Sequence, residues 1–235
     1  MVDQRNPAAS DSGPGTEAAP FRSISAAASK ASAGDTVLVH GGVYRERVAP
    51  ARGGASGKPI VYAAAPGARP VVRGSEMTAA SDWKKVGVAY ELVLLCANLT
   101  AKFETINGGV FDPYAIRLAW PGNESVIPSN GSAACTFDST LGQVFQKGEL
   151  LKEVANASAA DLLPMTWSAA ENGTVIRARF RDATAAPEDV EVTVRQRVFA
   201  PHVRGLGYIS IKGFVFEHAA VQWDDGFCER TSAFS

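Results

Sequence analysis

The chain has 235 residues, 46% hydrophobic and 20% charged, which is the composition of an ordinary globular protein. Its 23 Lys and Arg against 24 Asp and Glu leave a net charge of −1, which argues against a general nucleic-acid binder. No run approaches the ~18–20 apolar residues that a membrane span needs, and three scattered cysteines exclude a disulfide scaffold or a zinc site.

The first twenty residues, "MVDQRNPAASDSGPGTEAAP", lack a basic start followed by an apolar core, so they are not a secretory leader. Secreted and intracellular locations both stay open.

A helix is predicted in the next stretch, "FRSISAAASKASAG", which places Ile24, Ala27 and Ala28 on one face and ends at Gly34.

Short β-branched runs bounded by Gly, Pro and Ala follow the helix, and they recur. Residues 36–39 (TVLV) are followed by 59–62 (PIVY), a shift of 59 − 36 = 23 positions, and residues 44–48 have a counterpart in 70–74. A period in the low twenties indicates a solenoid. The predicted fold class is therefore all-β, a right-handed parallel β-helix with the helix as a cap over its first coil.

A doubly wound α/β fold is the alternative for parallel strands, but it needs a helix of about ten residues or more between them. The connecting residues 49–58, "APARGGASGK", do not form such a helix.

In the run 44–48, alternation predicts Arg45 and Arg47 on one face and Glu46 on the other, as on a solvated coil surface.

Longer strands arranged as hairpins are predicted from Glu76 to about Phe199. The expected turns are Lys147-Gly148 and Asn172-Gly173, and "EDVEVTVRQRVF" adds another alternating strand. Such strands indicate a small antiparallel β-sandwich. The pattern of short strands separated by glycine then returns in "YISIKGFVFEHAAVQWDDG". Three parts are therefore predicted: residues 1–75 as cap and first coils, 76–200 as an inserted sandwich, and 201–235 as the β-helix resumed.

The opening "DSGPGTEAAPFRSISAAASKASAGDTVLVHGGVYRERV" resembles that of right-handed parallel β-helix, pectate-lyase-like proteins. The segments "KPIVYAAAPGARPVVRGS" and "YISIKGFVFEHAA" are similar to the family 120 β-xylosidases among the glycoside hydrolases. The resemblance implies a sandwich inserted after the first coils and catalytic carboxylates on later coils. Because the chain stops at "ERTSAFS", we expect it to be a truncated N-terminal part that is inactive alone.

Four residues are candidates for substrate contact. Trp223 precedes Asp224 and Asp225, and a ring that stacks on a sugar beside carboxylates that bind hydroxyls suits a saccharide. The alternative is a plain Asp-Asp-Gly turn. His218 can orient a substrate hydroxyl or form a hydrogen bond at a coil corner. No catalytic residue is assigned, and no metal or cofactor is expected.

Three functions are weighed. The first is the N-terminal part of a β-helix glycoside hydrolase that acts on plant-type, xyloside-like oligosaccharides by a retaining two-carboxylate mechanism. The second is a polysaccharide lyase on the same scaffold, which needs Arg or Lys with a calcium-binding acidic cluster. The third is a non-catalytic carbohydrate-binding or surface module. The expected partner is an oligosaccharide or polysaccharide, with the oligomeric state open.

Overall fold

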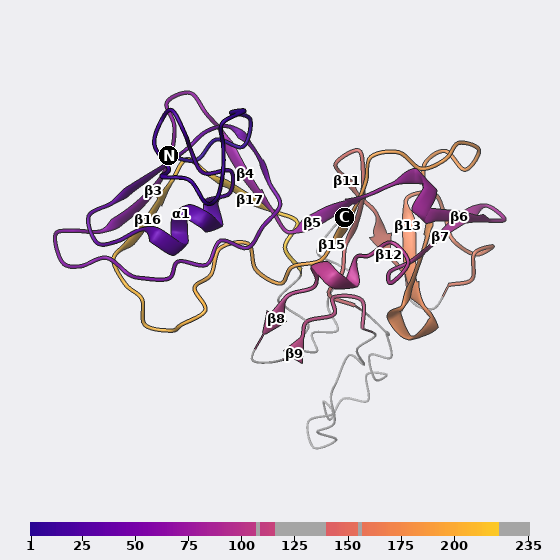
Figure 1. The fold of residues 1–235 in the computed structure, drawn as a ribbon. Helices are drawn as coiled ribbons and strands as arrows, with labels where there is room; N and C mark the ends of the chain where they lie inside the picture. The colour runs from indigo at the N-terminus through magenta and orange to yellow at the C-terminus, as the bar shows by residue number, and fades with distance from the viewer. Residues whose placement is uncertain (107–108, 116–139, 155–156, 221–235) are drawn as a thin grey trace, which may run out of the picture. The chain divides into compact units, whose positions relative to one another are not determined.

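A computed structural model describes residues 1–106, 109–115, 140–154 and 157–220. These residues form two compact units (Figure 1). Unit 1 comprises Met1–Gly74 and Arg197–Ala219, and unit 2 comprises Ser75–Gln196 and Ala220. The fold is mostly β, as the sequence predicts.

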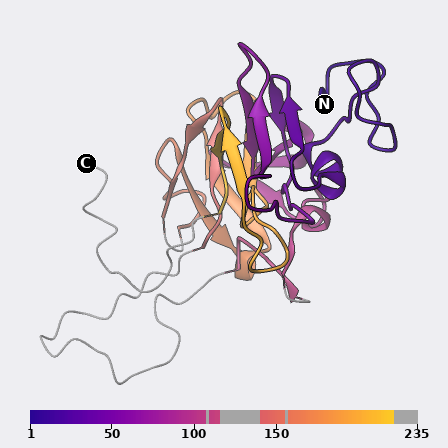
Figure 2. The same ribbon diagram turned by 90° about the vertical axis from the view of Figure 1, so that its left-hand side faces the viewer.

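Unit 1 contains one α-helix and six strands in two parallel sheets. In Figure 2 a yellow strand from late in the chain lies beside purple and indigo strands from its beginning. The sheets have the strand orders β1-β3-β16 and β2-β4-β17. The bounds are α1 (Ile24–Lys30), β1 (Thr36–Val39), β2 (Gly42–Tyr44), β3 (Ile60–Ala64), β4 (Pro70–Arg73), β16 (Ile209–Lys212) and β17 (Val215–Glu217). Segments more than 140 residues apart in the chain therefore pair directly.

Side chains on the inner faces of these sheets stand in line across the strands. In the first sheet Tyr62 pairs with Val37 on one side and with Ile211 on the other. In the second sheet Val72 lies between Tyr44 and Phe216. Val37, Tyr44, Tyr62 and Val72 are buried, and they belong to one core with α1. The predicted parallel pairing of the first two short runs is confirmed.

The register differs from the predicted one by two residues. Thr36 pairs with Val61, a shift of 61 − 36 = 25 positions rather than 23. Gly42 pairs with Pro70, a shift of 70 − 42 = 28, where the sequence comparison gave 70 − 44 = 26. A two-residue slip leaves every side chain on its predicted face, because strand side chains alternate with period two.

The predicted helix is confirmed as α1, and the side chains of Ser23 and Glu46 hold its N-terminus. The Ser23 hydroxyl accepts a hydrogen bond from the Ala26 amide at 3.1 Å, as an N-cap does. The Glu46 carboxylate accepts the amides of Ile24 and Ser25, each at 2.8 Å. Glu46 is thus a helix cap, and its prediction as part of a solvated surface is wrong.

Unit 2 is built of strands that contribute to one core. A four-stranded sheet has the order β11-β10-β15-β5, and a five-stranded sheet has the order β12-β13-β14-β7-β6. The bounds are β5 (Ser75–Thr78), β6 (Trp83–Val86), β7 (Ala89–Val93), β8 (Thr105–Ile106), β9 (Gly109–Val110), β10 (Val144–Gln146), β11 (Glu149–Leu150), β12 (Lys152–Glu153), β13 (Thr166–Ala170), β14 (Val175–Arg179) and β15 (Val190–Thr193). Short 3₁₀ turns occur at Ala80–Asp82, Thr100–Lys102 and Glu171–Gly173.

Both predicted hairpins of unit 2 are present. Strands β10 and β11 pair around Lys147-Gly148, and β13 pairs with β14 around Asn172-Gly173. The two sheets share a core that includes Leu92, Trp167 and Val192. The pairing is not wholly antiparallel, however, because β12 runs parallel to β13. The chain reaches β13 through a connection rather than a tight turn, so a parallel neighbour is allowed.

Candidate functional site

The predicted site residues fall into two groups. Trp223, Asp224 and Asp225 lie outside the described residues. His218 is described, and it directly follows β17 at the end of the second sheet of unit 1. The environment of His218 is therefore the part of the predicted site that the structure addresses.

An ion pair precedes His218 on the outer face of that sheet. Arg73 on β4 and Glu217 on β17 are register partners, and the Arg73 Nε donates to Glu217 Oε1 at 2.7 Å. Their side chains are 20% and 30% exposed, so the pair contributes about 0–1 kcal/mol of stability. The pair matters mainly because it shows that neighbouring strands bring the charged groups of residues 73 and 217 within hydrogen-bond distance.

The backbone at His218 is held in an unusual conformation. His218 has φ 58°, in the left-handed region that residues other than glycine seldom adopt. The Gly74 amide donates to the Glu217 carbonyl at 3.0 Å, and a Cβ on Gly74 would lie 2.5 Å from the His218 carbonyl oxygen. A glycine at position 74 therefore permits the close approach that fixes the chain at His218.

Aromatic rings gather on the inner side of the same strands. Phe216 packs edge-on against Phe199 at 5.9 Å between ring centroids, and it stacks with Phe214 at 5.8 Å. Phe216 is nevertheless 40% exposed, and Ile211 on β16 is 39% exposed. Within the described part of the chain no strand pairs with the far edge of β16 or β17, so the third strand of each sheet ends the stack.

Sequence reasoning missed a set of buried charged groups in unit 2. Glu191 on β15 is 6% exposed, and it accepts a hydrogen bond from the Ser75 hydroxyl at 2.5 Å. Arg195 donates to Glu76 at 2.5 Å. All four residues of β15 are buried, because the strand lies between β10 and β5. The sequence pattern predicted an alternating strand here and gave no sign that both of its faces are buried.

Two tyrosines in the core of unit 1 have strongly shifted acidities. Burial raises the pKa of Tyr62 to about 12. Burial also raises the pKa of Tyr44 to about 12, opposed by a backbone hydrogen bond from Gln4. Neither phenol is suited to proton transfer near neutral pH, because both stay protonated there.

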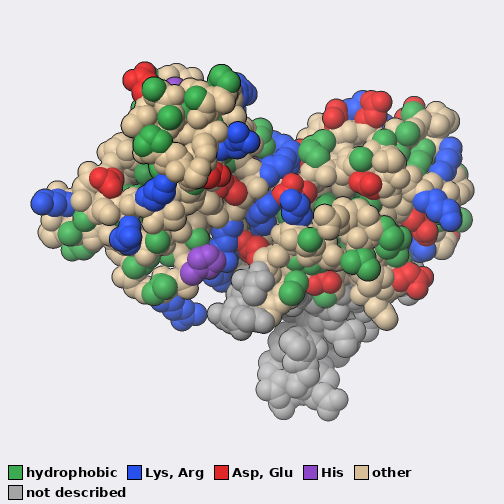
Figure 3. Space-filling view, in the orientation of Figure 1, with side chains coloured by type: hydrophobic (Ala, Val, Ile, Leu, Met, Phe, Trp, Pro, Cys, Tyr) green, Lys and Arg blue, Asp and Glu red, His purple; other side chains and the backbone are tan. Residues whose placement is uncertain are grey.

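Among the described residues no group of three His, Cys, Asp or Glu side chains is placed to hold a metal ion. No helix in the described ranges is long and apolar enough to cross a membrane. On the face drawn in Figure 3, acidic and basic side chains occur on both units.

Two solved structures are similar to the chain, whereas no protein-family model and no curated protein matches it. The first is described as the complex structure of XylC with xylose, with a TM-score of 0.67 and 30% identity over 92% of this chain. The second is described as a glycoside hydrolase, with a TM-score of 0.51 and 11% identity over 93% of this chain.

Each match covers most of this chain but only part of the other protein. The chain spans 35% of the XylC chain and 50% of the second protein. At 11% identity the second match shows the fold alone. Together they show that this chain has a fold like that of glycoside hydrolases.

Proposed function

We propose that the chain is the N-terminal part of a longer glycoside hydrolase that acts on xylosides. The observation that carries the proposal is the match to XylC, which was solved with xylose and which aligns with 92% of this chain at 30% identity. The share of XylC that is covered, 35%, leaves room for a catalytic region outside the 235 residues.

In this proposal unit 1 forms the first coils of a right-handed parallel β-helix. The pairing supports it, because β1, β3 and β16 lie side by side and so do β2, β4 and β17. Each coil contributes one strand to each sheet in chain order. Unit 2 is then a β-sandwich inserted between the second and third coils, at Gly74 and Arg197.

The β-helix supplies a physical basis for the reaction. Paired strands lie about 4.7–4.9 Å apart, which approaches the ~5–5.5 Å between the two carboxyl groups of a retaining glycosidase. Of two carboxylates on neighbouring coils, one can then act as the nucleophile and the other first as general acid and then as general base. The Arg73–Glu217 contact supports the argument, since it joins charged side chains of neighbouring coils on the outer face.

The residues of this chain have a supporting role in the proposal. We assign the catalytic carboxylates to coils beyond Ser235, and substrate contacts to His218, Trp223, Asp224 and Asp225. The bend fixed by Gly74 at His218 supports a positioned imidazole that forms a hydrogen bond with a sugar hydroxyl.

The test begins with the coding sequence past the codon for Ser235. We expect the frame to continue with short-strand coils that carry two acidic residues on neighbouring strands. The longer chain should release 4-nitrophenol from 4-nitrophenyl β-D-xyloside with retention of configuration by proton NMR, and the 235-residue chain should not. Unsaturated products from a polyuronate would instead identify a lyase. Binding of xylo-oligosaccharides without hydrolysis by the longer chain would identify a binding module.

A further inference from the structure

A solvent-open depression of about 380 Å³ lies within unit 1. Three segments form it: the N-terminal residues, the turn between β1 and β2, and the turn between β3 and β4. It is lined by Asp3, Arg5, His40, Gly41, Pro66, Gly67, Ala68 and Arg69. Its volume falls in the range of about 300–1,000 Å³ that is typical of small-ligand sites.

The depression holds more hydrogen-bond donors than acceptors. In the described part of the chain, no hydrogen bond or ion pair involves the guanidinium groups of Arg5 and Arg69 or the imidazole of His40. Asp3 is the acidic residue of the lining, and its Oδ1 already accepts the Arg5 amide at 3.0 Å. With two guanidinium groups against one carboxylate, the lining has an excess of positive charge and of N–H donors, a composition that fits an anion.

The backbone under these donors is fixed by contacts of its own. The His40 amide donates to the Val2 carbonyl at 2.9 Å, and the His40 carbonyl accepts the Tyr44 hydroxyl at 3.0 Å. Across the depression, the Ala68 amide donates to the Ala65 carbonyl at 2.9 Å. Both turns are therefore preorganised, which reduces the entropy lost on binding.

We propose that this depression binds the carboxylate of a uronic-acid sugar. Two guanidinium groups offer the planar paired donors that match a carboxylate, and the imidazole adds a third donor. Apart from Asp3, the rest of the lining leaves room and an apolar surface for a sugar ring, and it consists of Gly41, Pro66, Gly67 and Ala68. The choice of a sugar as carrier rests on the proposed function, whereas the anion site rests on the lining alone.

The test is a titration of the 235-residue chain, labelled with ¹⁵N, with D-glucuronate, D-glucose and inorganic phosphate in separate arms. We expect glucuronate to produce saturable shifts of the His40, Gly41 and Gly67 amide signals, and glucose to produce none. Phosphate should bind at least about tenfold more weakly than glucuronate. Equal or tighter phosphate binding would overturn the sugar assignment, and absence of glucuronate shifts at these amides would overturn the site.

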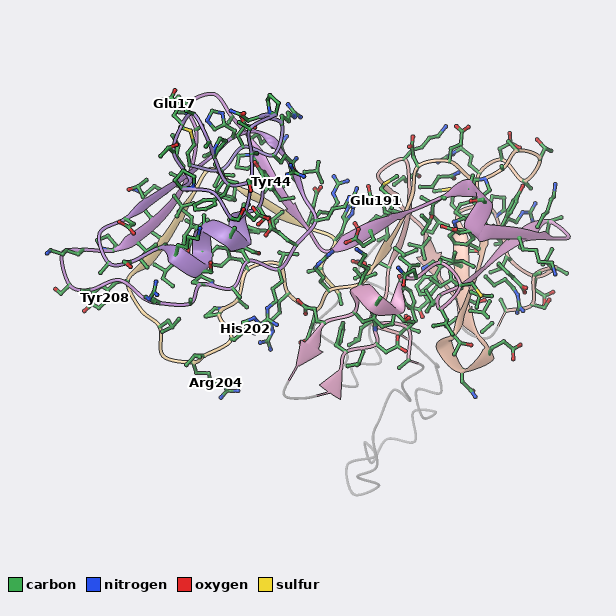
Figure 4. All side chains as sticks on the ribbon, viewed as in Figure 1. Glu17, Tyr44, Glu191, His202, Arg204 and Tyr208 are labelled. Atoms are coloured by element: carbon green, nitrogen blue, oxygen red, sulfur yellow. The ribbon has the colours of Figure 1, made fainter. Side chains whose placement is uncertain are left out.

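Variants separate the site from general charge. Arg5→Ala combined with Arg69→Ala should weaken glucuronate binding about tenfold or more, because each removes a charge-assisted hydrogen bond. Arg204→Ala is the matched control, since Arg204 is exposed, lies outside the lining and belongs to the same unit (Figure 4). Equal weakening by the control would contradict the proposal. Hydrolysis of an aryl β-xyloside by the longer chain tests the proposed function separately, so either proposal can fail alone.

Discussion

Two buried tyrosines in unit 1 differ in whether the hydroxyl forms a hydrogen bond. The Tyr44 hydroxyl donates to the His40 carbonyl at 3.0 Å, whereas the buried Tyr62 hydroxyl has no hydrogen-bond partner among the residues that the structure describes. Tyr62 packs its ring edge against Phe199 at 5.3 Å between centroids. Burial of the Tyr62 ring therefore stabilises the folded chain, whereas burial of its unpaired hydroxyl oxygen destabilises it.

The same substitution at these two positions should change stability in opposite directions. Tyr62→Phe should raise the free energy of unfolding by about 1 kcal/mol, because it removes an unpaired buried hydroxyl. Tyr44→Phe should lower it by about 1 kcal/mol, because it leaves the His40 carbonyl without its donor. Urea unfolding at neutral pH measures both. A loss of stability in Tyr62→Phe would show that its hydroxyl is in fact satisfied.

The raised pKa of Tyr62 predicts how stability depends on alkaline pH. Its pKa is about 12 in the folded chain and about 10 when unfolded. The unfolded chain therefore loses this proton first, so the contribution is complete below pH ~10 and is lost as pH rises toward ~12. The wild type should lose about 2 kcal/mol more than Tyr62→Phe by pH ~11.5.

Unfolding in urea over this pH range provides the measurement. Tyr208→Phe is the control, because Tyr208 is 60% exposed (Figure 4). It should keep the same alkaline loss as the wild type. Parallel curves for the wild type and Tyr62→Phe would contradict the assignment.

At the scale of elements, α1 has seven residues and no acidic residue in its own first turn. Helices this short are marginal by themselves. Glu46, from the segment after β2, supplies the missing negative charge and accepts two of the free amides.

Removal of that carboxylate should therefore weaken the attachment of α1. Glu46→Ala should lower the free energy of unfolding by about 1–2 kcal/mol and speed hydrogen exchange at the Ile24 and Ser25 amides. Glu17→Ala, at an exposed acidic residue of the same unit, should change stability by less than about 0.5 kcal/mol. Unchanged protection of both amides in Glu46→Ala would show that the cap does not depend on Glu46.

Two hairpin glycines of unit 2 provide a matched comparison. Gly148 and Gly173 have φ of 79° and 85°, so alanine is unfavourable at both. A Cβ at Gly148 meets nothing within 4 Å, whereas one at Gly173 would collide with the carbonyl oxygen of Tyr114. Gly148→Ala should cost about 1 kcal/mol, and Gly173→Ala should cost about 3 kcal/mol or more. Equal shifts in the urea midpoint would mean that Tyr114 moves aside freely.

Sequence patterns predicted the elements better than their pairing. The helix, the first strands and both hairpin turns follow from local signals such as Gly34, Lys147-Gly148 and Asn172-Gly173. The register was missed by two residues because alternation fixes only which face a side chain occupies. Registers that differ by two residues keep the same side chains buried, so loop length and core packing decide between them. The alternating sequence pattern contains no information on either.

The candidate site was predictable only where it is contiguous. The Trp223-Asp224-Asp225 run is visible as a sequence motif. The Arg73–Glu217 pair joins residues 144 positions apart, so it emerges only once β4 and β17 are in register. Arg5, His40 and Arg69 likewise come from three separate segments, which only the folded turns bring together.

At the scale of the molecule, the main hydrophobic clusters of the described residues belong to different units. The cluster of unit 1 includes Val39, Ile60 and Tyr62, and the larger cluster of unit 2 includes Leu92 and Ile176. The two clusters share no residue. Because hydrophobic burial is the main favourable term in folding, each unit has its own source of cooperative stability.

Equivalent cavities in the two cores should therefore act locally. Ile60→Ala and Ile176→Ala each remove three carbons from a fully buried side chain, which costs about 2–5 kcal/mol. In hydrogen exchange followed by mass spectrometry, Ile60→Ala should raise exchange at least about tenfold in peptides from 1–74 and 197–219, and Ile176→Ala in peptides from 75–196. Each variant is the control for the other. Faster exchange across both units in either variant would show that the two cores unfold as one, so that units 1 and 2 would form a single cooperative unit.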